Sequence, residues 1–436
     1  MCKNDSIRQP LPTRFLRHGE VKRCVTVTNN YNCWRACPSY NLSIFNYVCN
    51  IMKKIYTLFS IFILIVGCKN SIEKDKNCPH LLTHELVETE DVKKFHLPSH
   101  VLCYSIEMQV WEDPSKKELL YFLGKENSIL VYDLSEEKLI SEIKLQKDGP
   151  DAVGIATGFK VYTKDSILVT PKFSQNLFFI NEAGRKIFTI SYRDDKLKTS
   201  TTRCNHAVSI FSKDHLVYIP QFLEGNWNYL STKEFEEYRN TLEIDSKTNI
   251  FKRVGLGLPF HSSEYKTKSQ DYSVTEFENE YMYSFSGSDS IFITKDFKIF
   301  KSFLCASTNV TRPLANFLGT DDMQDIMKKQ VQSCSYQNLV WDPYREVIYR
   351  FYQIGAKDLK NSDNLFDLKN FPQSFGIMVL DKDLNVIADQ IMTSNKYFFN
   401  NFFVAKEGLY LSINHPSNQD MDYNYLSFEL IKLKKK

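Results

Sequence analysis

The chain has 436 residues, with 55 Lys and Arg against 52 Asp and Glu, and its formal net charge is +3. A charge so close to neutral does not provide the basic surface by which nucleic-acid-binding domains are recognised. The length exceeds the roughly 250–300 residues that one hydrophobic core supports, so the fold must be repetitive or divided.

The segment from Met52 to Cys68 has the parts of an export signal. Two lysines follow Met52, an apolar run covers 55–66, and the small residue Gly67 precedes Cys68. The run is shorter than the roughly 20 apolar residues of a membrane-spanning helix. Its end resembles the lipobox of bacterial lipoproteins, which implies cleavage after Gly67 and lipidation of Cys68. The alternative is a buried core helix that ends in cysteine.

Residues 1–51 lie upstream of this signal and show no sustained periodicity. We interpret them as an over-extended, disordered start of the reading frame. The alternative is a basic cytoplasmic tail before an uncleaved anchor, which the positive-inside rule permits. Without residues 1–67 the chain keeps 46 basic and 50 acidic residues. The mature protein is therefore mildly acidic, and we expect no nucleic-acid partner.

Residues 68–91 are predicted to form a polar, lipidated tether before a folded domain over 92–436. Five side chains that can bind metal lie in or near the tether: Cys78, His80, His84, His96 and His100. A structural zinc site needs four donors at fixed spacing, which this segment lacks. We therefore expect no metal ion, and no motif indicates another cofactor.

From Met108 onwards one unit recurs six times. It begins with two strands of β-branched and aromatic residues joined by a charged turn, which predicts a β-hairpin. The six hairpins cover 108–123, 159–169, 207–219, 272–285, 339–351 and 401–413.

A second pair of strands follows each of the first five hairpins. The first strand of each pair ends in a polar turn residue: Asp133, Asn181, Asp245, Thr294 and Asp381. The intervals between these residues are 48, 64, 49 and 87, so the base period is near 49 with two insertions. Four antiparallel strands per period predict the blades of a β-propeller.

The sixth unit is one strand short, because only 425–433 follows its hairpin. We predict that the strand 92–97 pairs beside it and closes the ring, which leaves no long exposed edge. The predicted fold is all-β, a six-bladed β-propeller of four-stranded antiparallel blades closed by an N-terminal strand. The alternative is a β-sandwich or two smaller β-domains.

Two further features concern the insertions and the cysteines. The insertion 311–332 in the fifth blade begins with acidic residues and ends with lysines, which suits the dipole of a short helix. Five cysteines follow Cys68, and we expect them to be mainly small buried apolar residues. The alternative for two of them is a disulfide between Cys305 and Cys334.

Function is expected on the face where the loops joining strands two and three, and those joining successive blades, gather around the axis. These loops contain polar and aromatic residues: Asp148, Arg203, Asn205, His206, Gln221, Trp227, His261, Arg312, Tyr336, Tyr352 and His415. Six are selected as binding candidates: Arg203, Asn205, His206, Trp227, His261 and His415. Arg203 and His206 come first, since they flank the start of an innermost strand. For each of them, the alternative is a solvated loop residue with no function.

Three stretches carry a resemblance to a known family: 127–133, 340–351 and 406–416. With them the chain resembles the bacterial lipoproteins that share domain of unknown function 4221, which are similar to TolB-like six-bladed propellers. The resemblance implies the fold and an envelope location. It implies no catalytic residue.

The favoured function is a cell-envelope lipoprotein that binds a protein, peptide or glycan through the loop face and the membrane through the lipid on Cys68. The alternative is a hydrolase or lyase that acts on a polysaccharide or small ester. No nucleophile elbow, zinc-protease helix or phosphate-binding glycine loop is present, which favours binding. Because Lys69 is not acidic, we expect the outer membrane, facing the periplasm or the cell surface.

Overall fold

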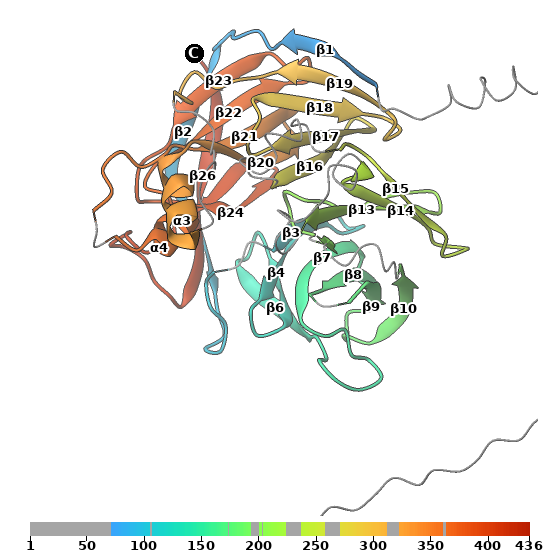
Figure 1. Ribbon diagram of the computed structural model, residues 1–436. Coiled ribbons are helices and arrows are strands. Elements are labelled where there is room, and N and C mark those ends of the chain that lie inside the picture. The colour runs from blue at the N-terminus through green and yellow to red at the C-terminus, as the bar shows by residue number, and fades with distance from the viewer. Residues whose placement is uncertain are drawn as a thin grey trace, which may run out of the picture. The chain divides into compact units, whose positions relative to one another are not determined.

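The computed structural model describes residues 71–104, 107–172, 174–192, 200–202, 204–223, 237–257, 271–311, 322–360 and 363–436. All of them belong to one unit, Cys68–Lys436. Their strands form six sheets arranged around a common axis (Figure 1). The predicted six-bladed β-propeller is confirmed, and the β-sandwich alternative is wrong.

The strands of each blade are given from the axis outwards. Blades 1 and 2 contain β3 (Met108–Glu112), β4 (Glu118–Gly124), β5 (Ser128–Asp133) and β6 (Lys138–Lys144), then β7 (Ala156–Thr163), β8 (Ser166–Pro171), β9 (Asn176–Ile180) and β10 (Lys186–Ser191). Blade 3 contains β11 (Ser200–Thr202) and β12 (Phe211–Lys213), then β13 (Leu216–Leu223), β14 (Thr241–Asp245) and β15 (Phe251–Val254).

The remaining blades follow the same order. Blade 4 contains β16 (Tyr272–Phe277), β17 (Glu280–Phe285), β18 (Ser290–Thr294) and β19 (Ile299–Leu304). Blades 5 and 6 contain β20 (Ser335–Asp342), β21 (Val347–Gln353), β22 (Phe375–Asp381) and β23 (Val386–Ile391), then β24 (Phe398–Ala405), β25 (Gly408–Ser412) and β26 (Tyr425–Lys435).

The turn residues that define the repeat have a shared physical role. In blades 1 to 5 the side-chain oxygen of each one accepts hydrogen bonds from backbone N–H groups two to four residues ahead, at 2.8–3.3 Å. Such Asx and Ser/Thr turns reverse the chain between the third and fourth strands. A short polar side chain therefore makes this turn in each of these five blades.

The ring closes as predicted. β2 (His84–His96) pairs antiparallel with β26 and becomes the outermost strand of blade 6. β2 begins at His84, however, so the second part of the expected tether is strand. A register shift between Glu88 and Val92 lets this long strand follow the curved edge.

The first part of the expected tether is also structured. β1 (Ser71–Asn77) pairs in parallel with β19 of blade 4, Cys78 forms a disulfide with Cys305, and the N–H groups of Leu81 and Leu82 bond to the carbonyl of Val386 in blade 5. Residues 71–96, here called the N-terminal strap, thus follow the outer edges of blades 4, 5 and 6 (Figure 1).

The strap corrects two expectations. Pairing with an edge strand uses only backbone groups, so the polar side chains of 71–77 did not signal a strand. The proposed disulfide between Cys305 and Cys334 is wrong, because Cys305 bonds to Cys78 and Cys334 is a free, buried thiol.

Two helices are described, and both belong to insertions next to blade 5. α3 (Met323–Gln332) lies within the predicted helical insertion, and its N-cap Asp322 accepts a bond from the N–H of Gln324. α4 (Leu365–Asn370) lies in the loop between β21 and β22 and packs against α3. The sequence did not predict α4.

The hydrophobic core is divided among the interfaces between neighbouring blades. One cluster joins Phe351 and Ile377 of blade 5 to Phe402 and Leu411 of blade 6, and similar clusters occupy other interfaces. Each blade thereby buries both faces of its sheet. This division explains how a chain of this length folds without one oversized core.

Candidate functional site

The innermost strand of blade 3 is interrupted, and the chain that interrupts it enters the axis of the ring. β11 pairs with residues 221–223 of β13, and β12 pairs with residues 216–218 of the same strand. Residues 204–210, here called the axial loop, lie between these two segments. They replace the continuous strand that the sequence predicted.

The axial loop contacts blades on three sides. The N–H of Val274 in blade 4 donates to the carbonyl of Ala207 at 2.9 Å, and the N–H of Ser209 donates back to Val274 at 3.2 Å. The thiol of Cys204 lies 3.3 Å from the carbonyl of Phe159 in blade 2. On the far side, the ring of His206 meets Phe402 of blade 6 edge-on, with 4.2 Å between centroids.

One glycine in blade 2 makes room for this loop. A Cβ atom on Gly158 would lie 1.9 Å from the carbonyl oxygen of Cys204. No side chain fits at that distance, so the approach of the two backbones requires glycine. The position of the axial loop thus depends on a glycine in β7.

A cavity of about 420 Å³ lies at the axis on one side of the axial loop. All six blades contribute to its lining, which consists of Glu107, Thr157, Lys172, Thr202, Asn205, Ala207, Val208, Phe222, Asp271, Tyr272, Ser273, Ser286, Tyr336, Gln337, Asn338 and Asn400. Apart from Asn205, Ala207 and Val208 of the axial loop, these residues lie near the starts of innermost strands and the ends of second strands, on the predicted loop face. We call this cavity the axial cavity.

Hydroxyl and amide groups dominate the polar part of the lining. The hydroxyls of Ser273 and Ser286 are buried and have no hydrogen-bond partner within the described residues. The amide of Asn338 donates to the amide oxygen of Asn400 at 3.1 Å, which links blades 5 and 6. Unpaired buried hydroxyls are costly unless a bound molecule satisfies them, so the two serines indicate a polar ligand.

Aromatic rings form another wall of the axial cavity. Tyr272 and Phe222 stack at 4.4 Å with 10° between their planes. The Tyr272 hydroxyl lies 2.8 Å from the carbonyl of Asn240 and 3.0 Å from that of Gln221. Those bonds hold the ring in place beside the polar groups.

Few charges reach the axial cavity. Its carboxylates are Glu107, which precedes β3 of blade 1, and Asp271, which precedes β16 of blade 4. Blades 1 and 4 are opposite each other in a ring of six. Of the described residues that line it, Lys172 is the one with a positive charge.

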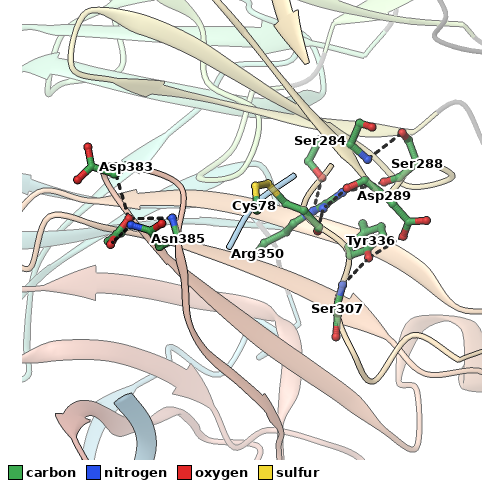
Figure 2. Close-up of a disulfide and its surroundings, with 12 residues drawn as sticks. Cys78, Ser284, Ser288, Asp289, Ser307, Tyr336, Arg350, Asp383 and Asn385 are labelled. Atoms are coloured by element: carbon green, nitrogen blue, oxygen red, sulfur yellow. Dashed lines mark hydrogen bonds between the residues drawn. A yellow bond between two sulfur atoms is a disulfide. The ribbon is translucent and has the colours of Figure 1, made fainter. Parts of the chain in front are cut away.

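A buried arginine supports the wall at blades 4 and 5 (Figure 2). Arg350 of β21 is fully buried and donates to the hydroxyl of Ser284 and to the carbonyls of Ser288, Asp289 and Cys305, at 2.6–3.0 Å. Its guanidinium also lies 3.5 Å from the ring centre of Tyr336. Burial lowers the pKa of Arg350 to about 10, so the group stays charged at neutral pH.

A second cavity, of about 290 Å³, lies against the axial loop and shares Asn205 with the axial cavity. Cys204, His206 and Ser209 line it, whereas Ala207 and Val208 line the axial cavity. The loop therefore separates the two. Lys160 lines the second cavity, where its ammonium group bonds to the carbonyl of Ile210 and burial lowers its pKa. Burial raises the pKa of the Cys204 thiol to about 11.

The structure separates the sequence-selected candidates. Asn205 and His206 lie in the axial loop. His415 is only 2% exposed, its Nδ1 accepts a bond from the N–H of Ser417, and its ring packs edge-on against Phe371. That position favours a structural role. Arg203, Trp227 and His261, like Cys68, lie outside the described residues.

Sequence reasoning missed most of the cavity lining. Tyr336 and Asn205 were named, but the two unpaired serines, Gln337 and the paired asparagines were not. Each of these residues stands within a few positions of a predicted strand end on the loop face. The sequence signal that could have revealed the cavity was the set of polar residues at those positions in all six blades.

Two further observations concern the described residues alone. None of them form a group of three or more His, Cys, Asp or Glu side chains that could hold a metal ion. Neither helix in this part of the chain is long and apolar enough to span a membrane.

Comparison with known families gives one match, to a domain of unknown function, DUF4221, over residues 83–390. The matched region runs from the closing strand β2 to the end of blade 5. No curated protein matches the chain.

Among solved structures, a member of the DUF4221 family from Bacteroides vulgatus is 23% identical, with a TM-score of 0.71 over 81% of this chain and 99% of the other. A presumed exported protein from Bacteroides fragilis is 11% identical, with a TM-score of 0.49 and coverages of 84% and 100%. BamB from Moraxella catarrhalis is 10% identical, with a TM-score of 0.36 and coverages of 80% and 98%. The first of these supports the fold, and the other two are too distant to support an argument.

Proposed function

We propose that the propeller of this chain, which belongs to the DUF4221 family, is the glycan-binding domain of a lipid-anchored envelope protein. The observation that carries the proposal is the axial cavity, where hydroxyl and amide groups from blades 2 to 6 converge on one space.

The chemistry of the lining favours a sugar. Hydroxyl and amide groups both donate and accept hydrogen bonds, as the hydroxyls of a sugar do. The hydroxyls of Ser273 and Ser286 have no partner among the described residues, so a sugar that reaches them would supply the missing bonds, and the Tyr272 ring offers an apolar wall. A volume of about 420 Å³ is within the range of small-molecule sites, so the cavity suits one or two sugar units rather than a protein surface.

Binding accounts for the cavity better than catalysis. The carboxylates of Glu107 and Asp271 come from opposite blades, and the rest of the polar lining is mainly hydroxyl and amide groups. A hydrolase or lyase that uses these two carboxylates is the second candidate, because they are the acids that reach the axial cavity.

The envelope location rests on two independent features. The sequence over 52–68 has the form of a lipoprotein signal. The disulfide between Cys78 and Cys305 is of the kind that persists in oxidising compartments outside the cytoplasm. We therefore propose that Cys68 is lipidated and that the protein is held at the outer membrane. Metabolic labelling with a fatty acid should mark the protein, and Cys68→Ser should abolish the label.

Glycan binding is tested with the purified lipoprotein in detergent. It is screened against immobilised bacterial and host glycans, and the Kd of any glycan retained is measured by calorimetry. Ser273→Ala combined with Ser286→Ala removes two ligand bonds at roughly 0.5–1.5 kcal/mol each, so the Kd should rise about 5- to 150-fold. Ser302→Ala, a buried serine in the outer strand of the same blade, is the matched control.

The same incubations separate the two candidates. If mass spectrometry finds a shortened glycan, and Glu107→Gln or Asp271→Asn stops its formation, the hydrolase or lyase is correct. If no glycan is retained and none is cleaved, the glycan proposal is wrong.

A further inference from the structure

The outer rim of blades 2, 3 and 4 exposes large apolar side chains. They are Ile187 and Phe188 on β10, Ile250 immediately before β15, and Ile299 on β19, with exposed fractions of 57%, 45%, 70% and 51%. All four lie at or next to the start of the fourth strand of their blade, and in blade 4 β1 pairs outside that strand. β10, β15 and β19 follow one another along the rim (Figure 1).

Basic residues outnumber acidic ones in the outer hairpins that carry these side chains, although Lys252 and Lys295 are paired with Glu243 and Glu280. The outer hairpins 176–191, 241–254 and 290–304 hold four acidic residues, Glu182, Glu243, Asp245 and Asp296. They hold eight basic residues, Arg185, Lys186, Lys247, Lys252, Arg253, Lys295, Lys298 and Lys301. The corresponding hairpins of blades 1 and 5, 128–144 and 375–391, have the opposite balance, with four acids against two bases and three against one. The four apolar residues with the eight basic ones are called the rim patch.

The start of the N-terminal strap is next to this patch. β1 begins at Ser71, which pairs with Ile299 of the rim patch. Cys68 is three residues upstream of Ser71, and three extended residues span at most about 10 Å. A lipid on Cys68 therefore leaves the domain beside Ile299, without the long tether that the sequence suggested.

We propose that the rim patch is a membrane-contacting surface that lies on anionic lipid headgroups. This inference rests on the proposed lipidation of Cys68, because the lipid is what brings the patch to the bilayer. Exposed apolar side chains among Lys and Arg are the features of proteins that lie in the membrane interface, where anionic lipids attract the cations.

The contact would also orient the axial cavity. The hairpins of the rim patch join third to fourth strands, whereas the axial cavity is lined from the loops at the opposite ends of the strands. With the rim patch on the membrane, the axial cavity faces the aqueous side. A glycan could then reach it without crossing the lipid surface.

The test uses the mature lipoprotein reconstituted in vesicles of phosphatidylethanolamine and phosphatidylglycerol. Ile250→Cys is labelled with an environment-sensitive fluorophore, and the matched control is Tyr423→Cys. Tyr423 is 62% exposed in the loop between β25 and β26, on the face opposite the rim patch. The free cysteines at 103, 204 and 334 are buried and should not react.

Emission from position 250 should shift to shorter wavelength and be reduced by a lipid-soluble quencher, and emission from position 423 should show neither effect. Lys247→Glu with Lys298→Glu should reduce the shift in these vesicles, and vesicles of phosphatidylcholine alone should already show the smaller shift. If the protein floats with the vesicles but position 250 remains as exposed to water as position 423, the membrane-contacting surface is refuted and the anchor stands. If the protein does not float, both proposals fail.

Discussion

Removing the disulfide between Cys78 and Cys305 should lower the stability of the whole ring. The bond links residues 227 positions apart, so it closes a loop that contains blades 1 to 4 in the unfolded chain. The chain-entropy relation gives about 5 kcal/mol for a loop of that length, and measured disulfides typically contribute about 2–4 kcal/mol. With an unfolding entropy near 2.1 cal/mol/K per residue, a unit of this size should lose about 3–6 °C in Tm.

The measurement is thermal unfolding of the full protein with and without a thiol reductant. Cys78→Ala combined with Cys305→Ala should lower the Tm and abolish its dependence on the reductant. Cys334→Ala is the matched control, since it removes a buried sulfur that is in no disulfide. The reasoning is refuted if the fall in Tm of the double variant, divided by its two cysteines, is no larger than that of Cys334→Ala. It is also refuted if the reductant leaves the wild-type Tm unchanged.

Three other predictions concern single positions. Gly158→Val should destabilise the protein by about 1–3 kcal/mol in urea unfolding, because the new side chain overlaps the carbonyl of Cys204. Gly257→Ala is the control and should be neutral, because the nearest atom to its new Cβ is 3.5 Å away. Arg350→Met should cost about 3–5 kcal/mol in the same assay by leaving buried acceptors unpaired, and Arg350→Lys should not restore the loss, since an ammonium lacks the planar fork. Burial lowers the pKa of His415 from its usual 6.5, so its contribution to stability is complete above about pH 6.5 and is lost as the pH falls below that value. His415→Gln should therefore flatten the plot of unfolding free energy against pH below pH 6.5. An unchanged slope there would contradict the prediction.

The blades could be predicted because each one repeats the same local rules. Alternating apolar residues and one polar turn residue per blade are local signals, and residues such as Asp133 and Asp381 serve the same turn in different blades. The closing strand could be predicted from the number of strands, because the sixth unit lacked one strand and the segment 92–97 belonged to no other blade. The axial loop did not follow, because 207–210 has the composition of a strand yet bonds to a neighbouring blade.

The parts that the sequence did not predict depend on contacts between distant segments. β1 pairs through backbone groups alone, and the partner of Cys305 cannot be deduced from cysteine spacing. The axial cavity combines single polar residues from six blades, and none of them differs locally from an ordinary loop residue. Ser273 and Ser286 become notable only when their burial and lack of partners are known.

The order of contacts along the strap also determines how the molecule would respond to mechanical force. A pull on the N-terminus reaches β1 first and the Cys78–Cys305 bond next, before it reaches β2. The covalent bond diverts the load into the edge of blade 4. The hydrogen bonds between β2 and β26 that close the ring lie beyond this bond along the chain. A pull on the N-terminus would therefore not begin by peeling β2 away from β26.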